Sequence, residues 1–106
     1  MLKFIFLILC VIAAVQSICL PLGGVNGLGY INICDSYKKN CKSVSSYRRT
    51  CINIIGNAYY WGNSKSSDYH CKVYSNQGCS GSTFIVGKTL TKFPWRALSY
   101  TCPWKC

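Results

Sequence analysis

Nine cysteines in a chain of 106 residues constrain the fold more than any other feature of this sequence. Cys10 lies in the first 17 residues, which have the character of a secretory leader, so eight cysteines remain in the mature chain. An even number in a short secreted chain predicts a disulfide framework, here of four bridges. Zinc is a poorer interpretation, because no Cys-x-x-Cys pair occurs and the sequence has a single histidine, His70. The predicted disulfide cysteines are Cys19, Cys34, Cys41, Cys51, Cys71, Cys79, Cys102 and Cys106.

The N-terminal segment, residues 1–17, has the three parts of a signal peptide. Lys3 provides the charge, residues 4–15 form an apolar core, and Val-Gln-Ser provides a cleavage site after Ser17. The apolar run is too short for a membrane span, which needs about 20 residues. We therefore expect a secreted, extracellular protein whose residues 18–106 form a single domain.

The charge of the chain is strongly one-sided. Twelve lysines and arginines face two acidic residues, Asp35 and Asp68, and glutamate is absent. Such a surface attracts polyanions, which include anionic lipids, cell-wall phosphates, acidic glycans and nucleic acids. The alternative interpretation is that the charge serves solubility alone.

The first half of the mature chain contains short β-like runs. Residues 30–34 predict a strand, and residues 35–40 predict a turn. The isoleucine-rich residues 50–55 predict a buried strand, and the aromatic residues 58–61 predict another. The polar segment GNSKSS, residues 62–67, is interpreted as a flexible bridge between two halves of the domain.

The second half, residues 69–102, repeats this layout. Residues 70–74 predict a strand, residues 75–78 a turn, residues 83–86 a second strand and residues 98–102 a closing strand. We interpret the halves as two units of about 40 residues, 30–67 and 69–106, that arose by internal duplication. Because no segment of the mature chain shows helical periodicity, the expected fold class is an all-β sandwich or barrel.

Two stretches of the second half carry a resemblance to known families. The run YSNQGCSG resembles the first hairpin of a βγ-crystallin motif, with Tyr74, Cys79 and Gly81 at its key positions. The same run, together with FPWRA at residues 93–97, resembles the MiAMP1-like plant antimicrobial family, and the killer-toxin-like proteins are similar in architecture.

This resemblance implies a disulfide-stapled, βγ-crystallin-like double Greek key and an antimicrobial activity. It also implies one disulfide, between Cys51 and Cys102. The chain departs from the plant family in having eight mature cysteines where six are typical. In addition, a bond between Cys19 and Cys106 could join the two termini, and the partners of Cys41 and Cys79 stay open.

Enzymatic chemistry has little support in the sequence. General acid–base catalysis by paired carboxylates would require Asp35 and Asp68 to meet, and both lie in turn-like segments. His70 would be the only chemical anchor for a secreted nuclease, the least favoured alternative. With two carboxylates in the chain, calcium is not expected either. We therefore predict no enzyme, no catalytic residues, no cofactor and no metal site.

A basic cluster between residues 37 and 49 is the candidate binding site. Cations with interleaved aromatic rings can bind phosphates or stack on sugars. We expect a monomeric antimicrobial, antifungal or killer-toxin-like protein that binds an anionic cell-wall polymer or membrane surface of a microbe. The alternative is a non-toxic secreted effector or glycan-binding protein, and nucleic acid is not favoured as a partner. The candidate anion-binding residues are Lys38, Lys39, Lys42, Arg48 and Arg49, and the candidate contact aromatics are Tyr37, Tyr47 and Trp104.

Overall fold

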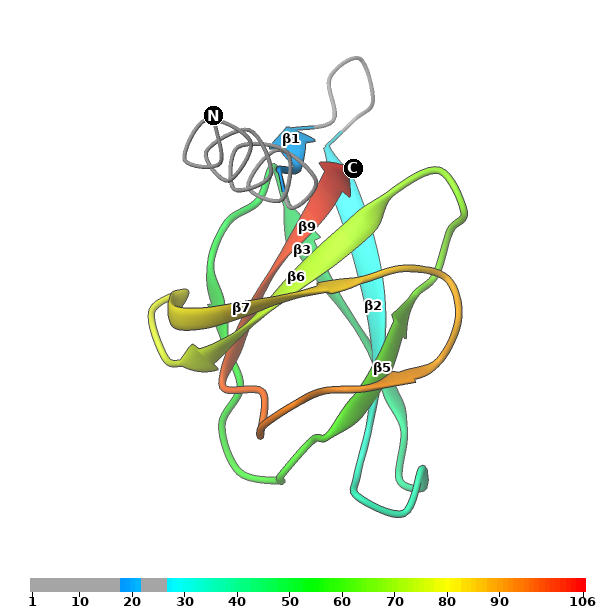
Figure 1. The fold of residues 1–106 in the computed structure, drawn as a ribbon, viewed down its shortest axis with the longest axis vertical. Coiled ribbons are helices and arrows are strands. Elements are labelled where there is room, and N and C mark those ends of the chain that lie inside the picture. The colour runs from blue at the N-terminus through cyan, green and yellow to red at the C-terminus, as the bar shows by residue number, and fades with distance from the viewer. Residues whose placement is uncertain (1–17, 22–26) are drawn as a thin grey trace, which may run out of the picture.

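The chain folds into two antiparallel β-sheets that pack face to face as a sandwich (Figure 1). The structure is a computed structural model and describes residues 18–21 and 27–106. The predicted signal peptide, residues 1–17, lies outside the described residues, within which no helix is long and apolar enough to cross a membrane. The strands of the described part are β1 (Leu20–Pro21), β2 (Leu28–Cys34), β3 (Lys42–Tyr47), β4 (Ile52–Asn53), β5 (Trp61–Ser64), β6 (His70–Asn76), β7 (Ser80–Val86), β8 (Thr91–Lys92) and β9 (Ser99–Lys105).

The strand order mixes the two halves of the chain. One sheet has the order β3-β2-β5-β8, and the other has the order β1-β9-β6-β7, with β4 also pairing with β9. β8 comes from the second half of the sequence, yet it pairs with β5 of the first half. β4 comes from the first half, yet it pairs with β9 of the second. Each sheet therefore includes a short strand contributed by the other half of the sequence.

The core lies between the sheets and follows the alternation of side chains along each strand. Ile31 and Ile33 of β2 and Val73 of β6 have no exposed surface. Alternate residues of a strand point to opposite faces, so their neighbours along each strand face outward. Full burial of an Ile or Val side chain contributes about 1.5–3 kcal/mol. The predicted strands at residues 30–34 and 70–74 are thus confirmed, and both extend further than predicted.

Four disulfides hold the sandwich together and indicate an oxidising environment. The bond between Cys19 and Cys106 closes a loop of 87 residues and ties the start of the described chain to its end. In the chain-entropy description, such a loop restricts the unfolded chain by about 4–5 kcal/mol, and a 7-residue loop by only about 2 kcal/mol. The remaining bonds join Cys34 to Cys41, Cys51 to Cys79, and Cys71 to Cys102.

The pairing of Cys51 with Cys102, implied by the family resemblance, is wrong. Cys102 is bonded to Cys71, because β6 and β9 are neighbours and these two cysteines flank their shared Lys72–Thr101 pair. Cys51 directly precedes β4, which pairs with the beginning of β9. The turn before β7 approaches the same part of β9, and there Cys79 forms a disulfide with Cys51.

The predictions for residues 50–67 also need correction. Only Ile52–Asn53 of the expected strand at 50–55 is extended, and Ile55 is 82% exposed. The strand expected at 58–61 begins at Trp61 and continues through the supposed flexible bridge to Ser64. Gly62 is required there for close packing, because a Cβ atom would lie 2.6 Å from the ring of Phe93.

Candidate functional site

The structure separates the basic cluster of the sequence into two groups. Lys38 and Lys39 lie in the loop between β2 and β3, and Lys42 begins β3. Arg48 and Arg49 follow the other end of β3. β3 has six residues, and a strand rises about 3.3 Å per residue, so roughly 20 Å separates the groups. We call them the loop cluster (Tyr37, Lys38, Lys39, Lys42, Tyr59 and Trp61) and the turn cluster (Tyr47, Arg48, Arg49, Lys72 and Trp104).

The loop that carries Lys38 and Lys39 is fixed internally by Asp35. Its carboxylate accepts hydrogen bonds from the backbone amides of Tyr37 and Lys39, each at 2.9 Å, and from the side-chain amide of Asn40 at 2.8 Å. These bonds, chiefly that of Lys39, hold the pKa of Asp35 below its ordinary value. The carboxylate thus has a structural role, and the disulfide between Cys34 and Cys41 at the base of the loop further restrains the loop.

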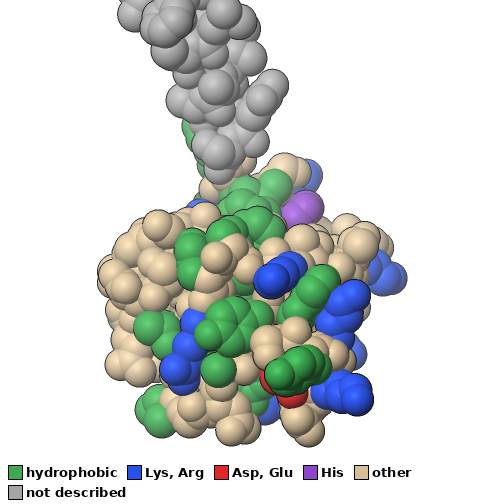
Figure 2. All heavy atoms as spheres, turned by 60° about the horizontal axis from the view of Figure 1, so that its bottom comes forward, with side chains coloured by type: hydrophobic (Ala, Val, Ile, Leu, Met, Phe, Trp, Pro, Cys, Tyr) green, Lys and Arg blue, Asp and Glu red, His purple; other side chains and the backbone are tan. Residues whose placement is uncertain are grey.

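Aromatic rings position the lysines of the loop cluster. The ammonium of Lys38 lies 4.3 Å from the centre of the Trp61 ring, and that of Lys42 lies 5.7 Å from the centre of the Tyr59 ring. A cation over an aromatic face is attracted by about 0.5–1 kcal/mol at an exposed site. Tyr37, by contrast, is 80% exposed. Figure 2 shows lysine and arginine side chains among hydrophobic ones at the end of the sandwich that lies at the bottom of Figure 1.

The turn cluster begins with a tight turn after β3. The amide of Thr50 donates a hydrogen bond of 2.9 Å to the carbonyl of Tyr47, and the two residues between them, Arg48 and Arg49, have φ angles of 49° and 62°. The amide of Arg49 also donates to the carbonyl of Cys102, at 2.9 Å, which docks the turn onto β9. The guanidinium of Arg48 lies 5.4 Å from the ring centre of Tyr47.

Trp104 receives a cation from each of two distant segments. The ammonium of Lys72 lies 3.5 Å from the centre of the indole ring, and the guanidinium of Arg49 lies 5.9 Å from it. The indole N–H donates to the hydroxyl of Thr101 at 2.8 Å, which fixes the orientation of the ring. Partial burial lowers the pKa of Lys72 by disfavouring its charged form.

Sequence reasoning missed Lys72, Tyr59 and Trp61 as members of these clusters. Alternation within His70–Asn76 places Lys72 on the outer face, since Cys71 and Val73 are buried. Its proximity to Trp104 depends on the register of β6 against β9, for which one sequence offers no signal. Of the predicted residues, the structure brings Tyr47, Arg48, Arg49 and Trp104 together, and it places Tyr37, Lys38, Lys39 and Lys42 at the other end of β3.

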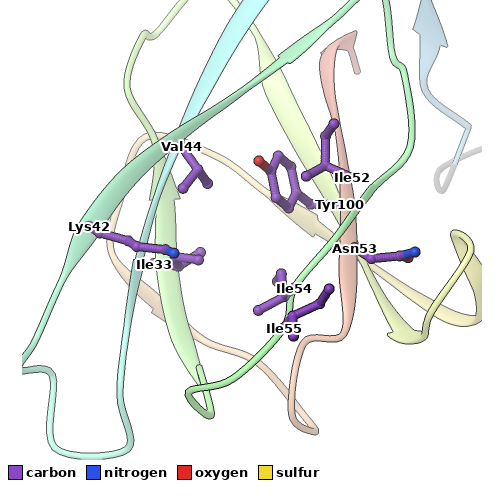
Figure 3. Close-up of a pocket in the computed structure, with 8 residues that line it drawn as sticks. All are labelled: Ile33, Lys42, Val44, Ile52, Asn53, Ile54, Ile55 and Tyr100. Atoms are coloured by element: carbon purple, nitrogen blue, oxygen red, sulfur yellow. The ribbon is translucent and has the colours of Figure 1, made fainter.

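Two hollows lie near the loop cluster. A cleft of about 100 Å³ opens between β3 and β4, with mainly aliphatic walls, the amine of Lys42 and the ring of Tyr100 (Figure 3). A second hollow, of about 360 Å³, lies beside the loop between β2 and β3 and includes Asp35 and Tyr59 in its lining. Neither contains a pair of titratable groups suited to acid–base catalysis. Asp35 comes directly after β2, and Asp68 comes after β5. Because these two strands are antiparallel, the two carboxylates lie beyond opposite ends of the strand pair.

The described residues contain no group of three or more His, Cys, Asp or Glu side chains placed to hold a metal ion. No protein-family model matches the chain, and searches of curated proteins and of solved structures return no match. The two clusters therefore provide the evidence on function, and their shared chemistry is that of cations held against aromatic rings.

Proposed function

We propose that this protein is secreted and binds anionic polymers or membranes at the surface of a microbe, with antimicrobial activity of the antifungal or killer-toxin-like kind. The observation that carries the proposal is the fixation of five cations over aromatic rings, at both ends of β3. A stacked lysine or arginine has already lost much of its side-chain entropy, so less is lost when its N–H groups bind an anion.

The charge balance of the chain supports an anionic partner. Twelve cations face two carboxylates in the sequence, and Asp35 is occupied with the backbone of its own loop. Neutralisation of the cationic surface must therefore come from outside the chain. Aromatic stacking keeps the charges close to the surface, where a polyanion meets several of them at once.

The scaffold that we propose is a double Greek key of βγ-crystallin type. The exchange of β4 and β8 between the sheets supports it: β2, β3 and β5 of the first half form one sheet with β8, and β6, β7 and β9 of the second half form the other with β4 and the N-terminal β1. In this interpretation, the disulfides make the barrel a rigid carrier that survives outside the cell.

Binding to vesicles and to cells tests the function. The folded protein is titrated onto vesicles of phosphatidylglycerol and of phosphatidylcholine, at low and at high ionic strength, and onto growing fungal cells. We expect binding to the anionic vesicles only, a strong loss of binding at high salt, and inhibition of growth. Absent or salt-insensitive binding, together with unimpaired growth, would refute the proposal.

Exposed tyrosine rings favour glycan binding without toxicity as a second candidate. Tyr37 is 80% exposed, Tyr47 51% and Tyr30 42%. Stacking of a sugar on an aromatic ring depends little on salt, whereas attraction to phosphates is screened. A glycan array probed at two ionic strengths separates the candidates: signals that persist at high salt favour the glycan-binding protein.

A further inference from the structure

Lys42 is a charged residue on the inward face of a strand. Residues directly opposite each other in an antiparallel pair lie on the same face of the sheet. Lys42 pairs with Ile33 of β2, and Ile33 has no exposed surface. The next inward residue of β3, Val44, pairs with the equally buried Ile31. The side chain of Lys42 therefore leaves β3 toward the facing sheet, where the alternation of the strand favours an apolar residue.

This ammonium enters the cleft between β3 and β4. The cleft has a volume of about 100 Å³, and Lys42 is exposed because its side chain borders an open space rather than a closed core. Figure 3 shows its amine end reaching from β3, alongside Ile33, into the space between the strands. The other walls are aliphatic or aromatic and include Val44, Ile52, Ile54 and Tyr100.

The other polar side chains of the lining are already committed. The hydroxyl of Tyr100 donates its hydrogen bond to the carbonyl of Ser45. Asn53 points away from the cleft in Figure 3, and its side-chain oxygen accepts a hydrogen bond of 2.7 Å from the amide of Gly78. Among the described side chains that line the cleft, Lys42 is thus the one that directs N–H donors into it. An ordered water needs about two to four polar partners, so these walls suit an apolar group better than water.

The rim of the cleft adds apolar surface and further positive charge. Ile54 turns inward and is buried, whereas Ile55 turns outward and is 82% exposed. The next residue, Gly56, accepts a hydrogen bond of 3.1 Å from the guanidinium of Arg96, which brings a second cation to the side opposite Lys42. A ligand that complements this site therefore combines a negative charge with a short aliphatic group.

The dimensions of the cleft restrict the ligand further. A cavity of roughly 150 Å³ holds a benzene molecule, so this cleft accepts a group of about four carbon atoms. A single ammonium points into it, which matches one negative charge. A phosphate group would bring up to about two charges, and loss of water from the second charge beside aliphatic walls is costly.

We propose that the cleft between β3 and β4 is a binding site for a short aliphatic carboxylate. Lys42 binds the carboxylate, and the carbon chain lies between Ile52, Ile54 and the ring of Tyr100. Ile55 covers the chain where it leaves the cleft. This site goes beyond the binding of surface polyanions and does not depend on it.

Protection of a sheet edge is the competing explanation for Lys42. β3 is an edge strand, and an inward-pointing charge on such a strand discourages pairing with another chain. This explanation accounts for the lysine but not for Ile55. An isoleucine exposed beside the same edge favours association rather than preventing it. A ligand with an aliphatic chain accounts for both residues.

Titration with isovalerate, a branched carboxylate of suitable size, tests the site. The methyl signals of Ile52 and Ile54 are followed by nuclear magnetic resonance, with Val86 of β7, outside the lining, as internal control. We expect saturable shifts at both isoleucines and a much smaller one at Val86. Isovaleramide, which lacks the charge, and acetate, which lacks the chain, should each bind at least about fivefold more weakly. Equal binding of isovalerate and isovaleramide, or shifts that never saturate, would overturn the proposal.

Two variants with the same change in charge show whether Lys42 itself binds the carboxylate. Lys42→Met keeps the aliphatic stem and should weaken isovalerate binding about fivefold or more, while binding of isovaleramide stays the same. Lys39→Met, at an exposed position outside the lining, should change either affinity less than about twofold. If Lys42→Met self-associates too strongly for titration, Lys42→Gln replaces it. Self-association of the variant with unchanged affinity for isovalerate would identify edge protection as the role of Lys42 and overturn the site.

Deletion of the exposed aliphatic side chain tests the rim. Ile55→Ala should weaken isovalerate binding about threefold or more, and Leu90→Ala, at another exposed apolar position, should leave it unchanged. Octanoate, which carries the same charge on a longer chain, identifies the source of the ligand. Tighter binding than isovalerate indicates a fatty acid that continues over Ile55, and weaker binding indicates a short free acid. Shifts of the cleft methyls that follow protein concentration instead of added carboxylate would show that a second copy occupies the cleft, which would overturn the proposal.

Discussion

Replacement of Tyr100 by Phe should destabilise the protein at neutral pH, and this difference from the wild type should change sign as the pH rises. Tyr100 is 3% exposed, and its hydroxyl donates a hydrogen bond of 2.9 Å to the carbonyl of Ser45. This bond connects β9 of one sheet with β3 of the other. Burial disfavours the phenolate and raises the pKa of Tyr100 from 10.0 to about 12.

The magnitude follows from this difference in pKa. The pKa of Tyr100 is higher in the folded state than in the unfolded state. The stability that comes from this difference is therefore complete below pH 10 and is lost as the pH rises through 12. Each unit corresponds to about 1.4 kcal/mol, so about 2–3 kcal/mol is lost in total, and about half of it by pH 11. At neutral pH, Tyr100→Phe should cost about 1 kcal/mol through the missing hydrogen bond. The two curves of stability against pH should therefore cross near pH 11.

Denaturant unfolding between pH 7 and pH 11, with the disulfides intact and short exposures at high pH, measures both effects. Tyr37→Phe is the matched control, because the ring of Tyr37 is 80% exposed and its removal should leave the shape of the curve unchanged. The reasoning is wrong if Tyr100→Phe and the wild type lose stability in parallel throughout this range. In that case the phenolate would be tolerated inside the sandwich.

Three further predictions concern the scaffold. Gly62→Ala should lower the free energy of unfolding by about 1–3 kcal/mol, because its Cβ would lie 2.6 Å from a buried phenyl ring and from a backbone carbonyl; Gly87→Ala, with its nearest contact at 3.5 Å, should show a much smaller loss in the same denaturant titration. Replacement of Cys19 and Cys106 by serine should cost about 4–5 kcal/mol in chemical unfolding, and a cost below about 1 kcal/mol would contradict the loop-entropy argument. Titration of Asp35 should move the shifts of the two backbone amides that its carboxylate binds, with a midpoint below pH 3.8, and an ordinary midpoint would show that these bonds are absent in solution.

Much of the fold was predictable where the pattern of the sequence is local. Alternation at residues 30–34 and 70–74 indicates strands with one buried face, and the structure buries Ile31, Ile33 and Val73 as this requires. The number of cysteines predicted four disulfides, and four are present. The connection of Cys19 with Cys106 is confirmed.

The errors arise where distant packing overrides local preference. Gly62 and Ser64 have low strand propensity, which made residues 62–67 look like a flexible bridge. In the fold, both residues are buried in β5, and Phe93 packs where the glycine has no side chain. Likewise, Cys51 pairs with Cys79 because β4 joins the sheet formed mainly by the other half of the chain, an exchange that local periodicity does not reveal.

The basic cluster illustrates how sequence distance misleads in an extended chain. Lys39 and Arg49 are ten positions apart, and in a helix they would lie about 15 Å from each other. The strand between them carries their groups to opposite ends of one edge of the sandwich, roughly 20 Å apart and well beyond the screening length. In compensation, the sheet register brings Lys72 and Trp104, which are far from the cluster in sequence, to Arg49.

This separation restricts the ligands that can use both clusters. Under the proposed function, a single phosphate group would reach one cluster only, so the loop cluster and the turn cluster would bind it as independent sites. A polymer with phosphates spaced along its length can occupy both, and attachment at one cluster then raises its effective concentration at the other. The exposed residues of β3 lie on the direct path between them and carry no acidic side chain to repel such a polymer. An extended cell-wall polyanion, one of the two surfaces in the proposed function, would therefore be able to contact both ends of β3 at once.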